Sequence, residues 1–389
     1  MKKIYLDNNA TTRMREEVLE AMLPYYKDIY GNASSVHEFG RQARRAVDDA
    51  RSKVAALIGA ASPEEIIFTS GGTESDNFAI KGIAHTLKSK GGRIITSTIE
   101  HHAVLNTCKF LEKEGYQVSY VGVDKDGIIK FDELKSAITD KTILISIMYA
   151  NNEMGTIEPI EEIGDIAKAK GVLFHTDAVQ AVGKMPFEVS KSNIDLLSLS
   201  GHKFYGPKGV GVLYLKKKTK ITPLLHGGHH EMNKRAGTEN VAGIVGLGKA
   251  AELAKKEIVE EAAYLKGLRD YLYKGISGAI PHTKLNGHPE KRLPNTLNVS
   301  FQYLEGESII LSLDMEGVSV STGSACTSGS LEPSHVLTAM GVEPVDSQGS
   351  IRFSLGRDNT KEDMDYCLKV LPPIIKRLRD MSPLYEKGK

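Results

Sequence analysis

Leu196-Leu197-Ser198-Leu199-Ser200-Gly201-His202-Lys203 joins a short apolar run to a polar one. The apolar half is bounded by turn-forming residues, a pattern that favours a buried strand over a helix. The polar half then forms a loop at the carboxyl end of that strand, where open α/β sheets bind their ligands. A lysine that is partly desolvated there is a better amine nucleophile than one in water, and such amines form Schiff bases with carbonyl groups. Lys203 is therefore a candidate catalytic residue, although most lysines in loops are simply solvated.

Further strand-like segments surround this one in the sequence. They lie at Ile66–Thr69, Arg93–Thr96, Gln117–Val123, Thr142–Met148, Val172–His175 and Gly209–Leu215. Helical stretches such as Asn77–Leu87 and Ala103–Glu114 alternate with them. Strands and helices in alternation are typical of an α/β protein whose sheet is covered on both faces. We expect a large domain built on a mostly parallel, seven-stranded sheet.

The pattern changes after about residue 258. A charged helical segment at Glu260–Lys274 leads to an alternating strand at Leu297–Phe301, and a helical stretch covers Lys361–Arg379. These segments predict a smaller α+β domain. Because 389 residues are too many for one small core, we expect two domains. The predicted large domain covers residues 15–258, and the small domain combines residues 1–14 with residues 259–389.

Composition argues against several classes of protein. Lys and Arg number 50 and Asp and Glu 49, so the net charge of +1 gives no electrostatic reason to expect nucleic acid or an anionic membrane as a partner. No apolar run is long enough to span a bilayer, and no signal-peptide core follows Met1-Lys2-Lys3. We therefore expect a cytoplasmic protein. The three cysteines are far apart, which argues against a disulfide framework and against a zinc site.

Asp177 and Gln180 follow the strand at Val172–His175 and should reach the same edge of the sheet as Lys203. A carboxylate there could keep a pyridine nitrogen protonated, and an amide could donate to a phenolate oxygen. Both features suit pyridoxal phosphate, whose aldehyde would react with the lysine. A helix N-cap is the alternative interpretation of Asp177.

Polar residues follow three more strands. Gly71-Gly72-Thr73 opens a helix, and backbone N–H groups at a helix N-terminus bind anions such as phosphate. The same segment is equally compatible with a plain turn. His101 could stack on a cofactor ring and move protons, and Asn152 could contact the ligand, unless each is only a polar residue at a helix start. The convergence of these residues on one sheet edge is a stronger signal than any one of them.

Cys326 lies within Ser319–Ser330, a segment rich in Ser, Thr and Gly. Those neighbours indicate an exposed, reactive thiol in a mobile loop, whereas Cys108 and Cys367 lie in helical patterns and read as structural residues. Arg352 interrupts an apolar strand, so it needs an anionic partner. That partner is either a substrate carboxylate or an internal salt bridge.

These motifs resemble those of the cysteine desulfurases, which are pyridoxal-phosphate enzymes of fold type I in the class V aminotransferase group. The resemblance extends over nearly the whole chain and within the family is strongest to group I members of the nitrogen-fixation type. The matching segments are Tyr5–Thr12, Gly31–Asn32, Ser35–His37, Thr69–Ser75, Glu100–His101, Ala150–Glu153, His175–Gln180, Ser200–Lys203, Arg235–Asn240, Ser324–Ser328 and Arg352–Ser354.

The resemblance implies a role for each candidate residue. Lys203 would carry the Schiff base and move the Cα proton, Asp177 would pair with the ring nitrogen, and Gln180 with the phenolate oxygen. His101 would stack on the ring and act as acid and base. The phosphate would be held by Gly72, Thr73, Ser200 and His202, with Thr238 of the second subunit of a homodimer.

Two further roles concern the substrate. Asn152, which would also contact the cofactor, and Arg352 would bind the carboxylate of L-cysteine. Cys326 would attack the substrate sulfur and carry it as a persulfide, leaving L-alanine. The resemblance implies that an iron–sulfur scaffold or another acceptor protein then receives the sulfur. A class V aminotransferase or a selenocysteine lyase would use the same lysine and aspartate, and a sulfur carrier without a cofactor would need only the cysteine.

Overall fold

A seven-stranded sheet forms the centre of the computed structural model, which describes residues 3–322 and 333–386. The strand order is β2-β8-β7-β6-β5-β3-β4, and β8 runs antiparallel to both of its neighbours while the other pairs are parallel. The strands are β2 (Ile66–Thr69), β3 (Arg93–Ser97), β4 (Gln117–Val121), β5 (Thr142–Ser146), β6 (Leu173–Asp177), β7 (Leu196–Ser200) and β8 (Gly211–Leu215). The predicted mostly parallel sheet is confirmed.

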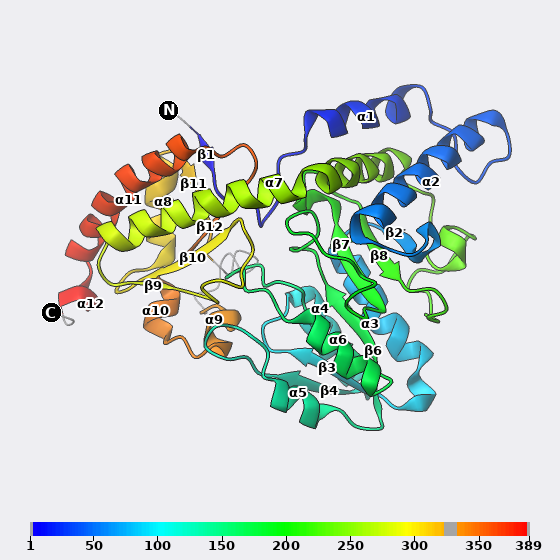
Figure 1. Ribbon diagram of the computed structural model, residues 1–389, viewed down its shortest axis with the longest axis horizontal. Helices are drawn as coiled ribbons and strands as arrows, with labels where there is room; N and C mark the ends of the chain where they lie inside the picture. The colour runs from blue at the N-terminus through cyan, green and yellow to red at the C-terminus, as the bar shows by residue number, and fades with distance from the viewer. Residues whose placement is uncertain (1–2, 323–332, 387–389) are drawn as a thin grey trace.

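Helices cover both faces of this sheet (Figure 1). One face packs against α3 (Gly72–Thr86) and α4 (His102–Lys113). The core on the other face includes residues of five helices: α1 (Glu16–Lys27), which packs on α7, α2 (Glu38–Ile58), α5 (Phe131–Ala137), α6 (Ile160–Ala169) and the first half of α7 (Val241–Ala279). Successive side chains of a strand point to opposite faces, and β2 shows this directly: Ile66 and Phe68 join one core and Ile67 the other.

A second group of elements encloses its own apolar core. Its sheet has the antiparallel order β12-β10-β9, and a separate parallel pair joins β1 to β11. The strands are β1 (Ile4–Tyr5), β9 (Thr283–Leu285), β10 (Thr296–Phe301), β11 (Val318–Ser319) and β12 (Ser350–Ser354), and the helices are α8 (Gly306–Met315), α10 (Pro344–Gln348), α11 (Lys361–Asp380) and α12 (Pro383–Glu386). Helix α9 (His335–Ala339) packs in a separate apolar cluster with Ile99 and Met148, which follow strands of the large sheet.

Helix α7 connects the two cores and runs along both parts of the molecule (Figure 1). Its 39 residues span about 58 Å at 1.5 Å per residue. Glycines in its first half allow close packing: a Cβ on Gly248 would lie 2.6 Å from the Cα of Ala50 in α2. The predicted boundary at residue 258 falls inside this helix. The division into two domains at that residue stays a prediction.

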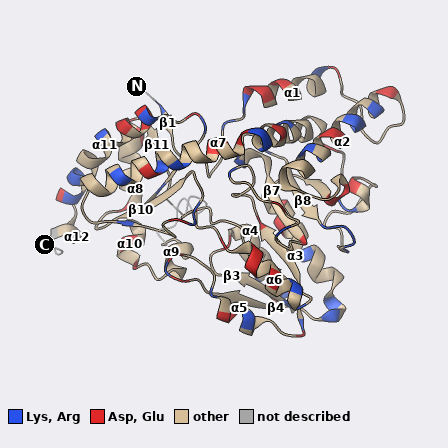
Figure 2. Ribbon diagram, viewed as in Figure 1, with Lys and Arg blue, Asp and Glu red and all other residues tan. Residues whose placement is uncertain are grey.

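Positions of Lys and Arg and of Asp and Glu are interspersed along the helices (Figure 2), and the net charge is +1. Within residues 3–322 and 333–386, no helix combines the length and apolar character needed to cross a bilayer.

Candidate active site

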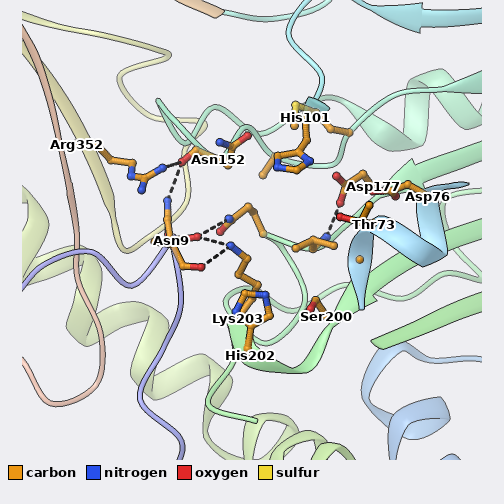
Figure 3. A pocket seen from close by; sticks show the side chains of 16 residues that line it. Asn9, Thr73, Asp76, His101, Asn152, Asp177, Ser200, His202, Lys203 and Arg352 are labelled. Carbon is orange, nitrogen blue, oxygen red and sulfur yellow. Dashed lines mark hydrogen bonds between the residues drawn. The ribbon is translucent and has the colours of Figure 1, made fainter. Parts of the chain in front are cut away.

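A cavity of about 330 Å³ lies at the carboxyl ends of β2, β3, β5, β6 and β7. Its walls include ten residues predicted from the sequence, several of which point toward one another in Figure 3. They are Gly72, Thr73, His101, Asn152, Asp177, Gln180, Ser200, His202, Lys203 and Arg352. Asn9, Ala10, Asp76, Met148, Ala150 and Val179 also line the cavity, and sequence reasoning did not select them.

Lys203 ends a short 3₁₀ turn directly after β7. Its Nζ donates to the backbone carbonyls of Asn9, at 2.6 Å, and of Ala10, at 2.9 Å. These two residues come from the N-terminal segment, where the backbone N–H of Asn9 donates to Ser354 Oγ of β12. The lysine is therefore held at the junction of the two cores. A signal for Asn9 existed in the sequence, because it stands inside the motif Tyr5–Thr12.

The N-terminus of α3 forms one end of the cavity. Gly71 precedes the helix with φ of +154°, a conformation that side chains disfavour, and a Cβ on Gly72 would lie 2.8 Å from Val179 Cγ2. The first amides of a helix have no acceptor within it, so they can bind an anion. Ser200 and His202 line the same cavity. Burial lowers the pKa of His202 to about 4, and its Nδ1 lies 3.1 Å from Thr11 Oγ1.

Asp177 ends β6 and is buried. Its Oδ1 accepts a hydrogen bond of 2.9 Å from the Val179 N–H, and a turn follows it rather than a helix, so it is not a helix N-cap. Burial raises the pKa of this carboxyl to about 6, against the lowering effects of the Val179 bond and the Lys203 charge. A cationic group in the cavity would stabilise the carboxylate.

A layer of buried polar groups lies behind Asp177. His175 Nδ1 lies 2.8 Å from Ser146 Oγ and its Nε2 lies 3.0 Å from Ser198 Oγ. Burial lowers the pKa of His175 to about 3. Asp76 Oδ1 lies 3.7 Å from His175 Nε2, and burial together with the charge of Asp177 raises the pKa of Asp76 well above its usual range. Asp76 stands four residues after Gly72, a helical spacing that could have indicated a shared face.

His101 is the N-cap of α4 and faces the cavity (Figure 3). Its Nδ1 accepts a hydrogen bond of 3.1 Å from the Ala103 N–H, so the proton of the neutral ring is on Nε2. Burial, followed by the positive charges of Lys203, His102 and His335, lowers the pKa of His101 to about 4. The ring is therefore neutral near pH 7 and can exchange a proton within the cavity.

Arg352 extends from β12 into the same cavity. Its Nη2 forms a salt bridge of 2.8 Å with Asp7 Oδ1, and its Nη1 donates to the backbone carbonyl of Asn152 at 3.0 Å. The predicted internal salt bridge is therefore present. The side chain also lines the cavity, and the substrate carboxylate as its partner stays a prediction.

The donor set fits pyridoxal phosphate. A helix N-terminus suits the phosphate, a buried carboxylate suits the protonated ring nitrogen, and a lysine amine lies in the same cavity.

Comparison with known proteins agrees with this geometry. Residues 4–367 match the family described as aminotransferase class-V. The chain is 60% identical to the cysteine desulfurase IscS of Methanosarcina thermophila over 386 residues. This aligned region covers 99% of this chain and 95% of that protein. The IscS of Dictyoglomus turgidum is 58% identical, over 100% of this chain and 98% of that protein. The chain belongs to the cysteine desulfurases of the aminotransferase class V family.

Solved structures place this cysteine desulfurase in the same fold. A NifS-like protein superimposes with a TM-score of 0.91 and 44% identity, covering 97% of this chain and 100% of that chain. A structure described as SspA in complex with cysteine gives a TM-score of 0.80 at 38% identity, covering 91% of this chain and 99% of that chain. The family and the fold expected from the sequence are therefore confirmed.

Two predicted site residues of the desulfurase are not among the residues that line the cavity in the described part of the chain. Thr238 is exposed on its own chain. Cys326 falls within residues 323–332, outside the residues that the structure describes. Cys108 and Cys367 are buried in α4 and α11, as expected, and burial raises the pKa of Cys108 to about 12.

Proposed function

We propose that this cysteine desulfurase binds pyridoxal phosphate in the cavity and converts L-cysteine to L-alanine, with Cys326 receiving the sulfur as a persulfide. The observation that supports this most strongly is the presence of Lys203, Asp177 and His101 around one space at the carboxyl edge of the sheet. Gly72, Thr73, Ser200 and His202 would hold the phosphate. Asp177 would face the ring nitrogen, Gln180 the phenolate oxygen, and Lys203 would hold the aldehyde carbon.

The proposed acid–base steps use two side chains. Bound pyridoxal phosphate supplies an electron sink that makes the Cα–H bond of an amino acid acidic. Lys203 Nζ would take the Cα proton, because the side chain lines the cavity and its amine is held by the Asn9 and Ala10 carbonyls, which line the same space. His101 would move protons at its Nε2, since Nδ1 is already occupied as an acceptor.

Arg352 and Asn152 would bind the substrate carboxylate. The guanidinium is buried, and its Nε has no hydrogen-bond partner among the described residues, so a carboxylate in the cavity would add a missing contact. The neighbouring Asp7 neutralises part of the charge, and we expect it to orient the guanidinium. The cysteine named with the related SspA structure supports this substrate class.

In the proposed sulfur transfer, Cys326 Sγ attacks the substrate Sγ and a new S–S bond forms. The carbon–sulfur bond breaks, its electron pair stays on carbon, and carbon takes up a proton to give alanine. The described residues on each side of Cys326 contact the cavity wall. Ser321 pairs with Arg352 through two backbone hydrogen bonds, and Ser334 Oγ donates to Glu153, the neighbour of Asn152.

The biological setting is also part of the proposal. We infer a cytoplasmic homodimer in which the partner's Thr238 reaches the phosphate; its exposure on its own chain is compatible with this role. The acceptor of the sulfur would be an iron–sulfur scaffold protein, and the resemblance to the nitrogen-fixation type suggests cluster assembly as the purpose.

The visible absorbance of purified protein tests the cofactor and the thiol separately. The wild-type protein should be coloured, and L-cysteine should change its spectrum. Lys203→Ala should lose this response, whereas Cys326→Ser should keep the colour but lose alanine formation. Undiminished alanine and sulfide formation by Cys326→Ser would refute the thiol's role and favour a lyase that does not need it, whereas an aminotransferase would form a keto acid from cysteine and no sulfide. A colourless protein that Lys203→Ala leaves unchanged would favour a sulfur carrier without a cofactor.

A further inference from the structure

Lys184 is a second lysine beside the cavity, and neither the family motifs nor the proposed mechanism gives it a task. Its side chain is buried, and its Nζ donates to Gln180 Oε1 at 2.6 Å and to Asn9 Oδ1 at 2.9 Å. Both acceptors are neutral. The nearby charges of Lys203 and Arg352 oppose a third positive charge, and Glu261 favours it. A buried lysine in such surroundings is costly, so its presence here calls for an explanation.

The hydrogen bonds around Gln180 fix the orientation of its amide. The Asn9 backbone carbonyl can only accept, so the group that faces it at 3.0 Å must be the Nε2 of Gln180. Lys184 then faces the oxygen of the same amide. Gln180 lines the cavity, and one Nε2 hydrogen remains available for a ligand. If the lysine were absent, Oε1 would lose its Lys184 donor, and only the Asn9 carbonyl would hold the amide in this orientation, so the amide could turn away from the ligand.

The backbone brings Lys184 to this place by a close approach. Gly183 has φ of +76°, and a Cβ on it would lie 2.4 Å from the Cβ of Phe204. Phe204 directly follows Lys203. A glycine therefore lets the turn that carries Gln180 and Lys184 pack against the loop that carries the catalytic lysine.

Asn9 completes the connection between the two lysines. Its backbone carbonyl accepts from Lys203 Nζ, and its side-chain oxygen accepts from Lys184 Nζ. The remaining Asn9 side-chain contacts are also made: Nδ2 donates to the Asn152 carbonyl and to Thr296 Oγ1, and Oδ1 accepts from Asn295 Nδ2. The hydrogen bonds of Nδ2 and Oδ1 therefore fix the orientation of the Asn9 side-chain amide.

We propose that Lys184 is a positioning residue that holds the Gln180 amide with its Nε2 toward the phenolate oxygen of the bound cofactor. This inference rests on the proposed function, which assigns that oxygen to Gln180. A hydrogen bond to the phenolate stabilises its deprotonated form, so its loss should raise the pKa of the chromophore.

The test is a pH titration of the visible absorbance of the cofactor-loaded enzyme. Lys184→Met should raise the titration midpoint by about one pH unit, the size expected for one hydrogen bond to a charged acceptor. Gln180→Leu should raise it similarly, and adding Lys184→Met to Gln180→Leu should change nothing further. An unchanged midpoint in Lys184→Met would overturn the inference. So would a shift from Lys184→Met that is as large in the Gln180→Leu protein as in the wild type.

Two more variants make the result specific. Lys184→Gln keeps a donor and should shift the midpoint less than Lys184→Met does; an equal or larger shift would count against positioning, and this variant also serves if Lys184→Met does not fold. Lys191→Met changes an exposed lysine of the following loop and should leave the midpoint in place. If Lys203→Ala had the same visible spectrum as the wild type, the proposed function itself would be refuted.

Discussion

Asp177 acquires its proposed role from burial and from its position at the end of β6. Asp177→Asn keeps the size and the Val179 contact but removes the negative charge. We expect alanine formation from L-cysteine to fall by a factor of about 10²–10³, the range for loss of one electrostatic stabiliser. Asp140→Asn, an exposed change of the same type, is the control. Equal rates for Asp177→Asn and wild type would show that no cation faces Asp177 during the reaction.

His175 makes a pH-dependent contribution to stability. Its pKa falls from 6.5 in the unfolded chain to about 3 in the fold because it is buried. Below pH 6.5 the unfolded chain takes up a proton that the folded protein excludes, so acid favours unfolding. Relative to His175→Asn, the wild-type free energy of unfolding should drop by about 1.4 kcal/mol per pH unit from pH 6.5 down to about pH 3. Denaturant unfolding at several pH values measures this difference; parallel curves would contradict it.

Single residues differ in how far the sequence could reveal them. Lys203, Asp177 and His101 follow strands, and strand ends are visible in a pattern of apolar runs. Asn9 could not be found in this way, because it reaches Lys203 across 194 residues of sequence through packing on β12. The second partner of Arg352, the Asn152 carbonyl, is hidden for the same reason.

At the scale of elements, the turn into α3 depends on glycine at two successive positions. Gly72→Ala would place a Cβ 2.8 Å from Val179 Cγ2, so Val179 or the turn would have to shift at the wall of the cavity that both residues line. We expect about tenfold weaker pyridoxal phosphate binding, a cost of ~1.4 kcal/mol, in a titration of the cofactor-free protein. Gly92→Ala, whose nearest neighbour would be an atom of Tyr116 at 3.7 Å, should bind normally. Equal affinity for Gly72→Ala and wild type would argue against phosphate binding at this turn.

Most elements could be predicted because their apolar patterns are local. The seven strands of the large sheet match the expected segments to within two residues at their ends, since β5, β7 and β8 are mostly apolar runs in which every residue is buried. Helix α7 was only partly anticipated. Its first half is rich in small residues that suit close helix packing, so the expected charged segment marked only the second half.

At the scale of the whole molecule, α7 should couple the unfolding of the two cores. Leu247 belongs to the core beside the large sheet and Leu272 to the core beside β10. Either change to Ala should cost about 2–5 kcal/mol, the usual range for a buried leucine. We expect calorimetry to show one transition that shifts as a unit in both variants. Two transitions, of which only one moves, would show that the cores unfold independently.

The proposed reaction as a whole depends on Cys326, which the sequence singles out by its small polar neighbours rather than by any strand pattern. Mass spectrometry of the protein after a single turnover with L-cysteine tests this most directly. We expect one extra sulfur atom on the peptide that contains Cys326, together with one alanine per sulfur. Alanine formed without sulfur on that peptide, and at the same rate in Cys326→Ser, would contradict the account.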